Sequence, residues 1–245
     1  MLKTPQKIES RVAIEPGFAW DAQDAYLFDI DGTLMRSRDR VHYDSVAASV
    51  ARVTGFEITL AGVLIHGSTD TAILREACCQ AGIPDRILEK HYDAILEAMR
   101  NSVAERRHEL DPELMPGVEE VLRHLARKGS LLGVASGNLE AIGWIKIEKA
   151  GLREWFRFGG FSDHFPVRAE LIGQAAQKAR ELAGSGAKIC VVGDTPRDVE
   201  AARANFLSVI AVATGRCSFE ELLECQPEAC ASSLADLMAM APSAG

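Results

Sequence analysis

The sequence predicts an α/β fold in which helices cover a parallel β-sheet and a helical segment is inserted after the first strand. Four short, continuous apolar runs are spaced widely along the 245 residues, and helical patterns lie between the later runs. Between the first run and the second, one long stretch carries only helical patterns. Continuous apolar runs are typical of strands that helices cover on both faces, and their alternation with helices indicates crossovers in a parallel sheet.

The first 36 residues are expected to contain an extension and the first strand. Residues 1–24 are polar and carry prolines and a glycine, so we predict a loosely attached extension, with a short extended piece at residues 12–14 and no chemistry of its own. The run AYLFDI at residues 25–30 predicts the first strand of the core.

Residues 37–114 interrupt the alternation of strands and helices. Segments such as STDTAILREACCQAG and PDRILEKHYDAILEAMRNSVAERRHEL have the periodicity of helices. We therefore predict a helical domain at residues 37–114, inserted into a core domain made of residues 1–36 and 115–245.

The rest of the core alternates helices with three more apolar runs. In PGVEEVLRHLARKG, a proline fits the first turn, Val118, Val121, Leu122 and Leu125 share one face, and Gly129 ends the helix. The runs LLGVAS (131–136), KICVVGD (188–194) and FLSVIAVATG (206–215) predict strands, and the tail from residue 231 predicts a short helix and a frayed end.

Composition excludes several classes of function. The formal net charge of −8, without a basic stripe, argues against nucleic acid as a partner. We predict a cytoplasmic protein that binds no membrane, because the sequence lacks both an apolar run of membrane-spanning length and a secretory signal. The six cysteines and six histidines show no spacing typical of metal sites, so any metal should have oxygen ligands.

Polar side chains follow three of the predicted strands at the edge where open α/β sheets bind ligands. The polar residues are Asp29, Asp31, Ser136, Asn138, Asp194, Thr195 and Asp198, and Gly137 lies among them. Clustered carboxylates suit a hard cation such as Mg²⁺. Beside that cation, one carboxylate can attack phosphorus and another can transfer protons, so this edge predicts phosphoryl chemistry.

Phosphate oxygens have donors at the same edge. Gly32 allows a sharp turn after the first strand, and the Ser136 hydroxyl lies near the backbone N–H groups of Gly137 and Asn138 at a predicted helix start. Loop amides at the start of a helix favour anions.

Three segments, DIDGTL, VASGN and VVGDTPRD, resemble in order three of the four motifs of the haloacid dehalogenase superfamily of phosphohydrolases. The resemblance covers residues 25 to about 240. It implies a Rossmann-like core, and the inserted helices resemble the cap of the phosphoglycolate-phosphatase-like branch.

The resemblance also implies roles for individual residues. Asp29 is expected to be the nucleophile and Asp31 the general acid and base, and Asp198 is expected to support the site or only to stabilise its helix. The expected phosphate ligands are Gly32, Thr33, Ser136, Gly137, Asn138 and a basic residue. The expected Mg²⁺ ligands are Asp29, the backbone carbonyl of Asp31, and Asp194.

The basic residue departs from the family pattern, because residues 150–177 contain no lysine. Arg168 stands 26 positions before Asp194, about where the family lysine falls, and its guanidinium can bind phosphate and a carboxylate together. We assign Arg168 this role; the alternatives are a solvated Arg168 with Lys146 or Lys149 in its place.

The segment HGSTDTAI (66–73) resembles a part of the cap that faces substrate in this family. The specificity candidates are therefore His66, Gly67, Thr69 and Asp70. The alternative is a plain helix N-cap at Ser68 or Thr69.

Together these features predict a Mg²⁺-dependent phosphatase that forms an aspartyl-phosphate and acts on a small phosphorylated metabolite, such as phosphoglycolate or a sugar phosphate. A phosphomutase like β-phosphoglucomutase and a non-catalytic phosphate-binding protein are the alternatives. A dehalogenase needs neither Asp31 nor Asp194, so the presence of both argues against that activity. The chain is expected to be a monomer or a homodimer.

Overall fold

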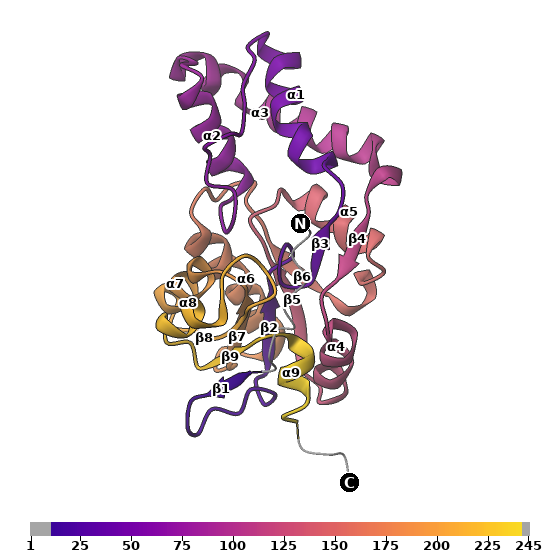
Figure 1. Ribbon diagram of the computed structural model, residues 1–245, viewed down its shortest axis with the longest axis vertical. Coiled ribbons are helices and arrows are strands. Elements are labelled where there is room, and N and C mark those ends of the chain that lie inside the picture. The colour runs from indigo at the N-terminus through magenta and orange to yellow at the C-terminus, as the bar shows by residue number, and fades with distance from the viewer. Residues whose placement is uncertain (1–10, 242–245) are drawn as a thin grey trace, which may run out of the picture.

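A computed structural model of the chain describes residues 11–241 and contains a seven-stranded sheet (Figure 1). In spatial order the strands are β1 (Val12–Ile14), β9 (Ala229–Ala231), β8 (Ser208–Val212), β7 (Ile189–Gly193), β2 (Ala25–Phe28), β5 (Leu131–Ala135) and β6 (Phe158–Gly160). Only the pairing of β1 with β9 is antiparallel within this sheet. The predicted α/β fold with a parallel core is therefore confirmed.

The register of the three central strands brings their carboxyl ends to one level. In β2, Phe28 lies opposite Val192 of β7 and opposite Val134 of β5. The residues that follow these strands therefore meet at one edge of the sheet, as the carboxyl ends of parallel strands do.

Helices cover both faces of the sheet. Tyr26 and Phe28 face α4 (Val118–Arg127), α5 (Glu140–Lys149) and α9 (Leu234–Met238). Ala25 and Leu27 face α6 (Arg168–Ala183), α7 (Pro196–Ala204) and α8 (Phe219–Glu224). All four residues of β2 are fully buried, because alternate side chains point to opposite faces and both faces are covered.

Three further helices, α1 (Val41–Thr54), α2 (Asp70–Gln80) and α3 (Asp85–Glu105), form a helical layer beyond one edge of the sheet (Figure 1). Their own core includes Leu74, Ile95 and Met99, as the helical periodicity predicts. The chain enters and leaves this layer through an antiparallel pair, β3 (Met35–Ser37) and β4 (Pro112–Leu114), which the sequence patterns did not predict. Short 3₁₀ helices span Arg107–Glu109 and Arg153–Trp155.

The described part of the N-terminal segment, residues 11–24, is packed against the core, so the prediction of a loosely attached extension is wrong there. The ring of Trp20 is buried and stacks on His124 with 5.6 Å between centroids. Asp21 lies 2.7 Å from His124 Nε2 and accepts a hydrogen bond of the same length from Lys128. The rest of the predicted extension (1–10) and the tip of the predicted frayed end (242–245) lie outside the described residues.

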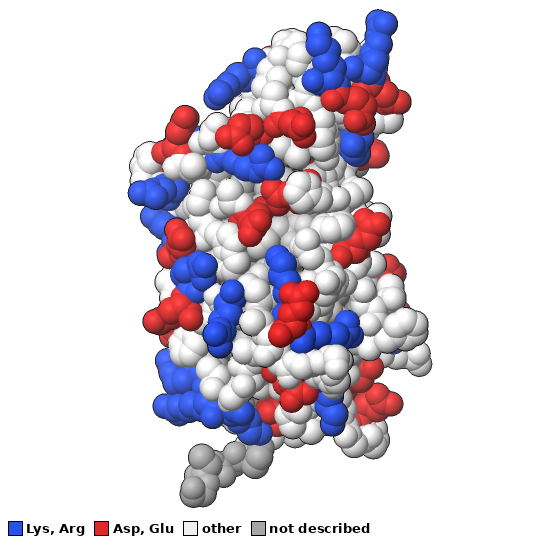
Figure 2. Space-filling model, turned by 180° about the vertical axis from the view of Figure 1, so that it is seen from behind, with Lys and Arg blue, Asp and Glu red and all other residues white. Residues whose placement is uncertain are grey.

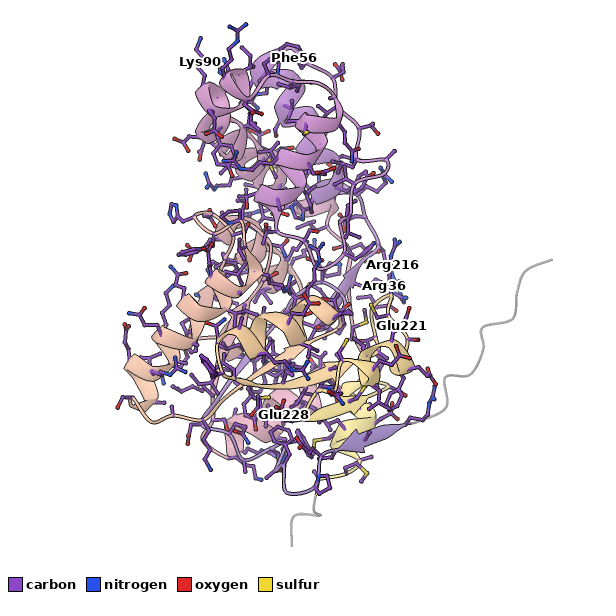
Figure 3. All side chains as sticks on the ribbon, turned by 90° about the vertical axis from the view of Figure 1, so that its left-hand side faces the viewer. Arg36, Phe56, Lys90, Arg216, Glu221 and Glu228 are labelled. Carbon is purple, nitrogen blue, oxygen red and sulfur yellow. The ribbon has the colours of Figure 1, made fainter. Side chains whose placement is uncertain are left out.

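Charged side chains of both signs are interspersed over the face shown in Figure 2. Figure 3 shows Phe56 and Lys90 at the end of the helical layer far from the sheet, and Arg36 and Arg216 near the level where this layer meets the core.

Within residues 11–241, no helix combines the length and apolar character needed to cross a membrane.

Candidate active site

Three buried carboxylates meet at the carboxyl edge of the sheet. Asp29 follows β2, Asp194 follows β7, and Asp198 lies in the first turn of α7. One carboxylate oxygen of each lies within 4.8 Å of the others, and none of the three residues is more than 5% exposed. The geometry that the sequence predicted from strand ends is therefore present for these three acids.

Two glycines allow the backbone to approach Asp194 closely. A Cβ on Gly32, which has a φ of +94°, would lie 2.3 Å from Oδ2 of Asp194. A Cβ on Gly215 would lie 1.7 Å from the same oxygen. Thr33 Oγ1 donates a hydrogen bond to Oδ1 of Asp194 (3.2 Å), so both residues of the predicted Gly32–Thr33 turn contact this carboxylate. Gly215 is not among the site residues that the sequence predicts.

Arg168, at the start of α6, is the cation that reaches Asp29. Its Nη2 lies 2.8 Å from Oδ2 of Asp29 and 2.7 Å from Oδ1 of Asp198, and its side chain is 7% exposed. Its Nε donates a hydrogen bond to the same Asp198 oxygen (2.9 Å). None of the described residues accepts a well-aligned hydrogen bond from Nη2. The structure thus places a buried guanidinium, and not a solvated one, beside the predicted nucleophile.

Asp198 makes contacts that fit both of the roles that the sequence left open. Its Oδ2 accepts hydrogen bonds from the backbone N–H (3.1 Å) and the hydroxyl (2.7 Å) of Thr195, in a capping box at the start of α7. Its Oδ1 faces Arg168. Asp198 therefore stabilises its helix and orients the guanidinium at the same time.

Asp31 belongs to a separate polar group. The ammonium of Lys146 donates hydrogen bonds to Oδ1 (2.9 Å) and Oδ2 (2.7 Å) of Asp31, and the Asn138 side-chain amide donates to Oδ2 (2.9 Å). The same amide donates to Ser136 Oγ (2.7 Å). The Asp31 side chain is 44% exposed, so it is open to a bound substrate.

The contact between Lys146 and Asp31 was missed by sequence reasoning, which considered Lys146 only as a substitute for Arg168. A signal was present, because Lys146 shares the buried face of α5 with Ile142, Gly143 and Ile147. A lysine on the apolar face of a helix requires an acceptor. Lys149, in contrast, is exposed and donates to the His108 carbonyl at 3.4 Å.

The pKa values of the two aspartates of DIDGTL shift in opposite directions. Burial, with Asp198 and Asp31, raises the pKa of Asp29 to about 6 against the influence of Arg168. The neighbouring protein atoms remove part of the water around Asp31, which acts to raise its pKa, but the charge of Lys146 and the hydrogen bonds from Lys146 and Asn138 outweigh this effect and lower that pKa. The pKa of Asp194 rises to about 8 because it is buried beside Asp29 and Asp198. Asp29 and Asp194 therefore need additional positive charge to remain ionised together.

The loop that precedes α2 joins the helical layer to this edge of the sheet. The backbone N–H of Asp70 donates to the Gly137 carbonyl (2.7 Å), and its Oδ2 accepts from the Leu139 N–H (2.8 Å). His42 Nε2, on α1, lies 3.0 Å from the same oxygen. A Cβ on Gly137 would lie 2.4 Å from the Ser68 carbonyl, so this glycine permits the close approach.

The cap candidates differ in their surroundings. The N-cap alternative is confirmed for Thr69, whose Oγ1 accepts a hydrogen bond from Ala72 N–H (3.2 Å). The Gly67 carbonyl accepts a hydrogen bond from Nη1 of Arg168 (3.3 Å). His66 is exposed, and its pKa is lowered by partial burial and by Arg216. Asp70 is buried in the contact between the layers.

Comparisons with known proteins agree with this geometry. A family model described as haloacid dehalogenase-like hydrolase matches residues 23–205. The chain belongs to this family. The resemblance of its motifs to that superfamily is thus confirmed, and so is the predicted enzyme class, a hydrolase of the phosphatase type.

Relatives of this hydrolase extend the comparison. It is 26% identical over 194 residues to the phosphoglycolate phosphatase of Agrobacterium fabrum, covering 77% of this chain and 80% of the relative. A protein of Haemophilus somnus described as a predicted phosphoglycolate phosphatase has 19% identity and a TM-score of 0.62, over 89% of this chain and 97% of its own. CbbY from Rhodobacter sphaeroides has 18% identity and a TM-score of 0.63, over 88% and 96%. The two structures share the fold.

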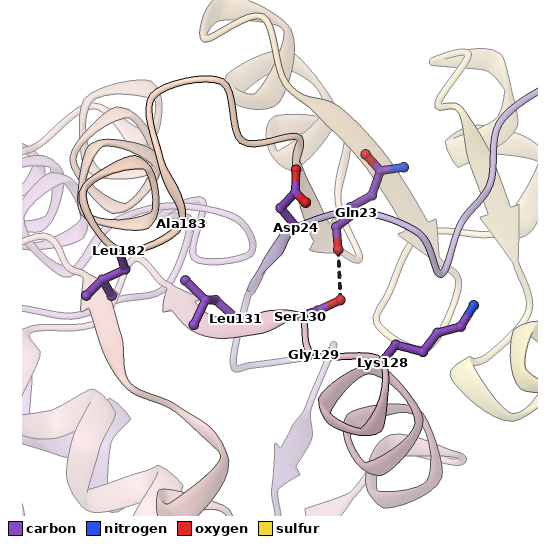
Figure 4. A pocket seen from close by; sticks show the side chains of 8 residues that line it. All are labelled: Gln23, Asp24, Lys128, Gly129, Ser130, Leu131, Leu182 and Ala183. Atoms are coloured by element: carbon purple, nitrogen blue, oxygen red, sulfur yellow. Dashed lines mark hydrogen bonds between the residues drawn. The ribbon is translucent and has the colours of Figure 1, made fainter.

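The hydrolase also has a hollow of about 330 Å³ at the opposite edge of the sheet (Figure 4). Its lining includes Gln23, Asp24 and Ser130, which precede β2 and β5, and the Ser130 hydroxyl donates to the Gln23 carbonyl (2.7 Å). Ligands of open α/β sheets bind at the carboxyl ends of the strands. The edge with the carboxylates is therefore the candidate active site.

Proposed function

We propose that this hydrolase is a Mg²⁺-dependent phosphatase that acts on a small phosphorylated metabolite through an aspartyl-phosphate on Asp29. The observation that carries the proposal is the position of Asp29, whose carboxylate lies 2.8 Å from the Arg168 guanidinium and within 4.8 Å of a second buried carboxylate, Asp194. A nucleophile for phosphorus needs such neighbours, because phosphoryl transfer depends on positioning and on neutralising charge.

The residues present fit a divalent cation. Asp29 and Asp194 are buried acids with raised pKa values: burial and the charges of Asp198 and Asp31 raise that of Asp29, and burial and the charges of Asp29 and Asp198 raise that of Asp194. A cation held by Asp29 and Asp194 would relieve this repulsion. We assign Mg²⁺ to Asp29, Asp194 and the Asp31 carbonyl, with Asp198 as a supporting residue. When bound, Mg²⁺ would neutralise charge on the phosphoryl group and orient it.

Each residue of the chain then has a role in the reaction. Nη2 of Arg168 and the Ser136 hydroxyl, with the backbone of the turns at Gly32 and Gly137, bind phosphate oxygens. A carboxylate oxygen of Asp29 attacks phosphorus and the bond from phosphorus to the ester oxygen breaks. Asp31, whose lowered pKa favours the carboxylate, takes the proton that a singly protonated phosphate ester brings and gives it to the departing oxygen. Asp31 then takes a proton from the water whose oxygen attacks the phosphorus, and the bond from phosphorus to the Asp29 oxygen breaks, which releases phosphate and restores the Asp29 carboxylate.

We further propose that residues 37–114 act as a cap that excludes bulk water from the reacting groups. The hydrogen bonds of Asp70 to Gly137 and Leu139 support this, because they hold the loop 66–70 against the phosphate-binding turn. We propose His66, Gly67, Thr69 and Asp70 as the residues of the cap that influence specificity. A substrate enclosed there is small, and the similarity to a phosphoglycolate phosphatase makes phosphoglycolate, with sugar phosphates, the first class to test.

The experiment that tests this function is phosphate release by the purified protein from a panel of phosphorylated metabolites, with Mg²⁺ and with EDTA. Release that requires Mg²⁺ and is lost in Asp29→Asn is the expected result. Release that persists in Asp29→Asn would remove the proposed nucleophile. Conversion of a sugar phosphate into its isomer without release would indicate a phosphomutase, and silence across the panel would favour a binding protein.

A further inference from the structure

Lys146 is a buried cation that has no role in the reaction proposed above. The residue is 4% exposed, although lysine is almost never fully buried without a partner. Its ammonium has three acceptors: both carboxylate oxygens of Asp31, at 2.9 and 2.7 Å, and Oδ1 of Asn138, at 2.9 Å. A lysine ammonium has three donors, so a phosphate oxygen could bind here only by displacing one of these contacts.

The partner of Lys146 is the more exposed member of the pair. The Asp31 side chain is 44% exposed, whereas that of Lys146 is 4% exposed and lies on the buried face of α5. A cation behind a carboxylate leaves the front of that carboxylate accessible. The pair is therefore arranged to orient Asp31 from the protein side and not to shield it.

Asn138 connects this pair to the phosphate-binding turn. Its amide nitrogen donates to Asp31 (2.9 Å) and to the Ser136 hydroxyl oxygen (2.7 Å), while its carbonyl oxygen accepts from Lys146 (2.9 Å). The position of Asp31 relative to the proposed phosphate ligand Ser136 is thereby restricted. A proton-transfer group is effective only when its orientation toward the reacting atom is maintained.

We propose that Lys146 is a positioning residue that holds the Asp31 carboxylate, together with Asn138, in the orientation required for proton exchange with the leaving-group oxygen. This inference rests on the proposed phosphatase function. Lys146 acts through Asp31, so its contribution depends on how much a substrate needs a proton at its departing oxygen. An alkyl phosphate needs that proton, whereas p-nitrophenyl phosphate has a leaving group that departs without it.

The test compares kcat/KM for p-nitrophenyl phosphate with kcat/KM for the alkyl phosphate of the panel that the wild type hydrolyses fastest. General acid–base catalysis contributes about 10²- to 10⁴-fold, so we expect Lys146→Met to lower kcat/KM for the alkyl ester by at least about tenfold more than for the nitrophenyl ester. In an Asp31→Asn background the same change should alter kcat/KM by less than about twofold, because residues that act as a unit are not additive. Lys149→Met, on the same helix, is the matched control.

Thermal unfolding of each variant separates a folding defect from a catalytic one, since a reduced folded fraction lowers both rates equally. If Lys146→Met does not fold, Lys146→Arg decides, with an expected selective loss of at least about threefold for the alkyl ester. Equal losses on both esters, additive losses with Asp31→Asn, or no loss would overturn the role of Lys146 while the phosphatase stands. A wild-type protein inactive on the whole panel would overturn the proposed function and this inference with it.

Discussion

Replacing Asp29 with asparagine should abolish turnover and, without metal, stabilise the protein at alkaline pH. Asp29 has an ordinary pKa of 3.8 and a pKa of about 6 in the folded chain, where burial dominates. One pKa unit corresponds to about 1.4 kcal/mol, so an ionised Asp29 destabilises the folded state by about 3 kcal/mol. Asparagine has nearly the same shape and carries no charge, so it avoids this cost.

The sign of the pH dependence follows from the raised pKa. The folded state holds the proton of Asp29 more tightly than the unfolded state, so this contribution to stability is complete below pH 3.8 and is lost as the pH rises through about 6. The variant should therefore match the wild type near pH 4 and exceed it by up to about 3 kcal/mol at pH 8. For a chain of this size the difference corresponds to about 6–12 °C in Tm.

The assay is thermal unfolding from pH 4 to pH 8 in EDTA, repeated with Mg²⁺, together with phosphate release. Mg²⁺ should stabilise the wild type more than the variant, and turnover by the variant should fall by at least about 10³-fold. Asp93→Asn, at an exposed position of α3, is the matched control and should change stability by less than about 0.5 kcal/mol. A variant that is less stable than the wild type at pH 8 in EDTA would refute the argument.

Three further predictions concern the surroundings of this carboxylate. Arg168→Met should cost about 3–5 kcal/mol of stability, because it leaves two buried carboxylates unpaired, and should weaken inhibition by inorganic phosphate; unchanged unfolding and inhibition would contradict its assignment. Asp194→Asn should raise the Mg²⁺ concentration for half-maximal activity by at least about tenfold, a response that a residue outside the metal site would not show. Asp70→Ala removes the acceptor for Leu139 N–H, so hydrogen exchange at residues 66–70 should accelerate and KM should rise; wild-type exchange there would argue against a closed cap.

Local patterns were sufficient for the elements whose signal lies within a few residues. The runs at β2, β5, β7 and β8 are continuous and apolar because helices cover both faces of the sheet. Each run can be recognised from its own few residues, without knowledge of the rest of the chain. The helix periodicity of residues 37–114 is equally local, and it predicted buried positions such as Leu74 and Met99. The convergence of Asp29 and Asp194 followed from the rule that parallel strands end at one edge.

Short strands and long-range pairs could not be obtained in this way. The strands β6 (Phe158–Gly160) and β9 (Ala229–Ala231) have three residues each, too few to show a period, and they are strands because β5 and β8 pair with them. In the same way β3 pairs with β4 across the whole helical insertion. The packing of residues 11–24 depends on partners such as His124 and Lys128, more than 100 positions away.

The motif residues and the order of strands and helices were therefore set by local composition and spacing, which folding does not alter. The choice of cation at each carboxylate came from three-dimensional packing. Arg168 reaches Asp29 because α6 begins beside the carboxyl end of β2, and Lys146 reaches Asp31 because one face of α5 is turned toward that edge. A buried charge is determined by the atoms that surround it, and most of those atoms come from distant parts of the chain.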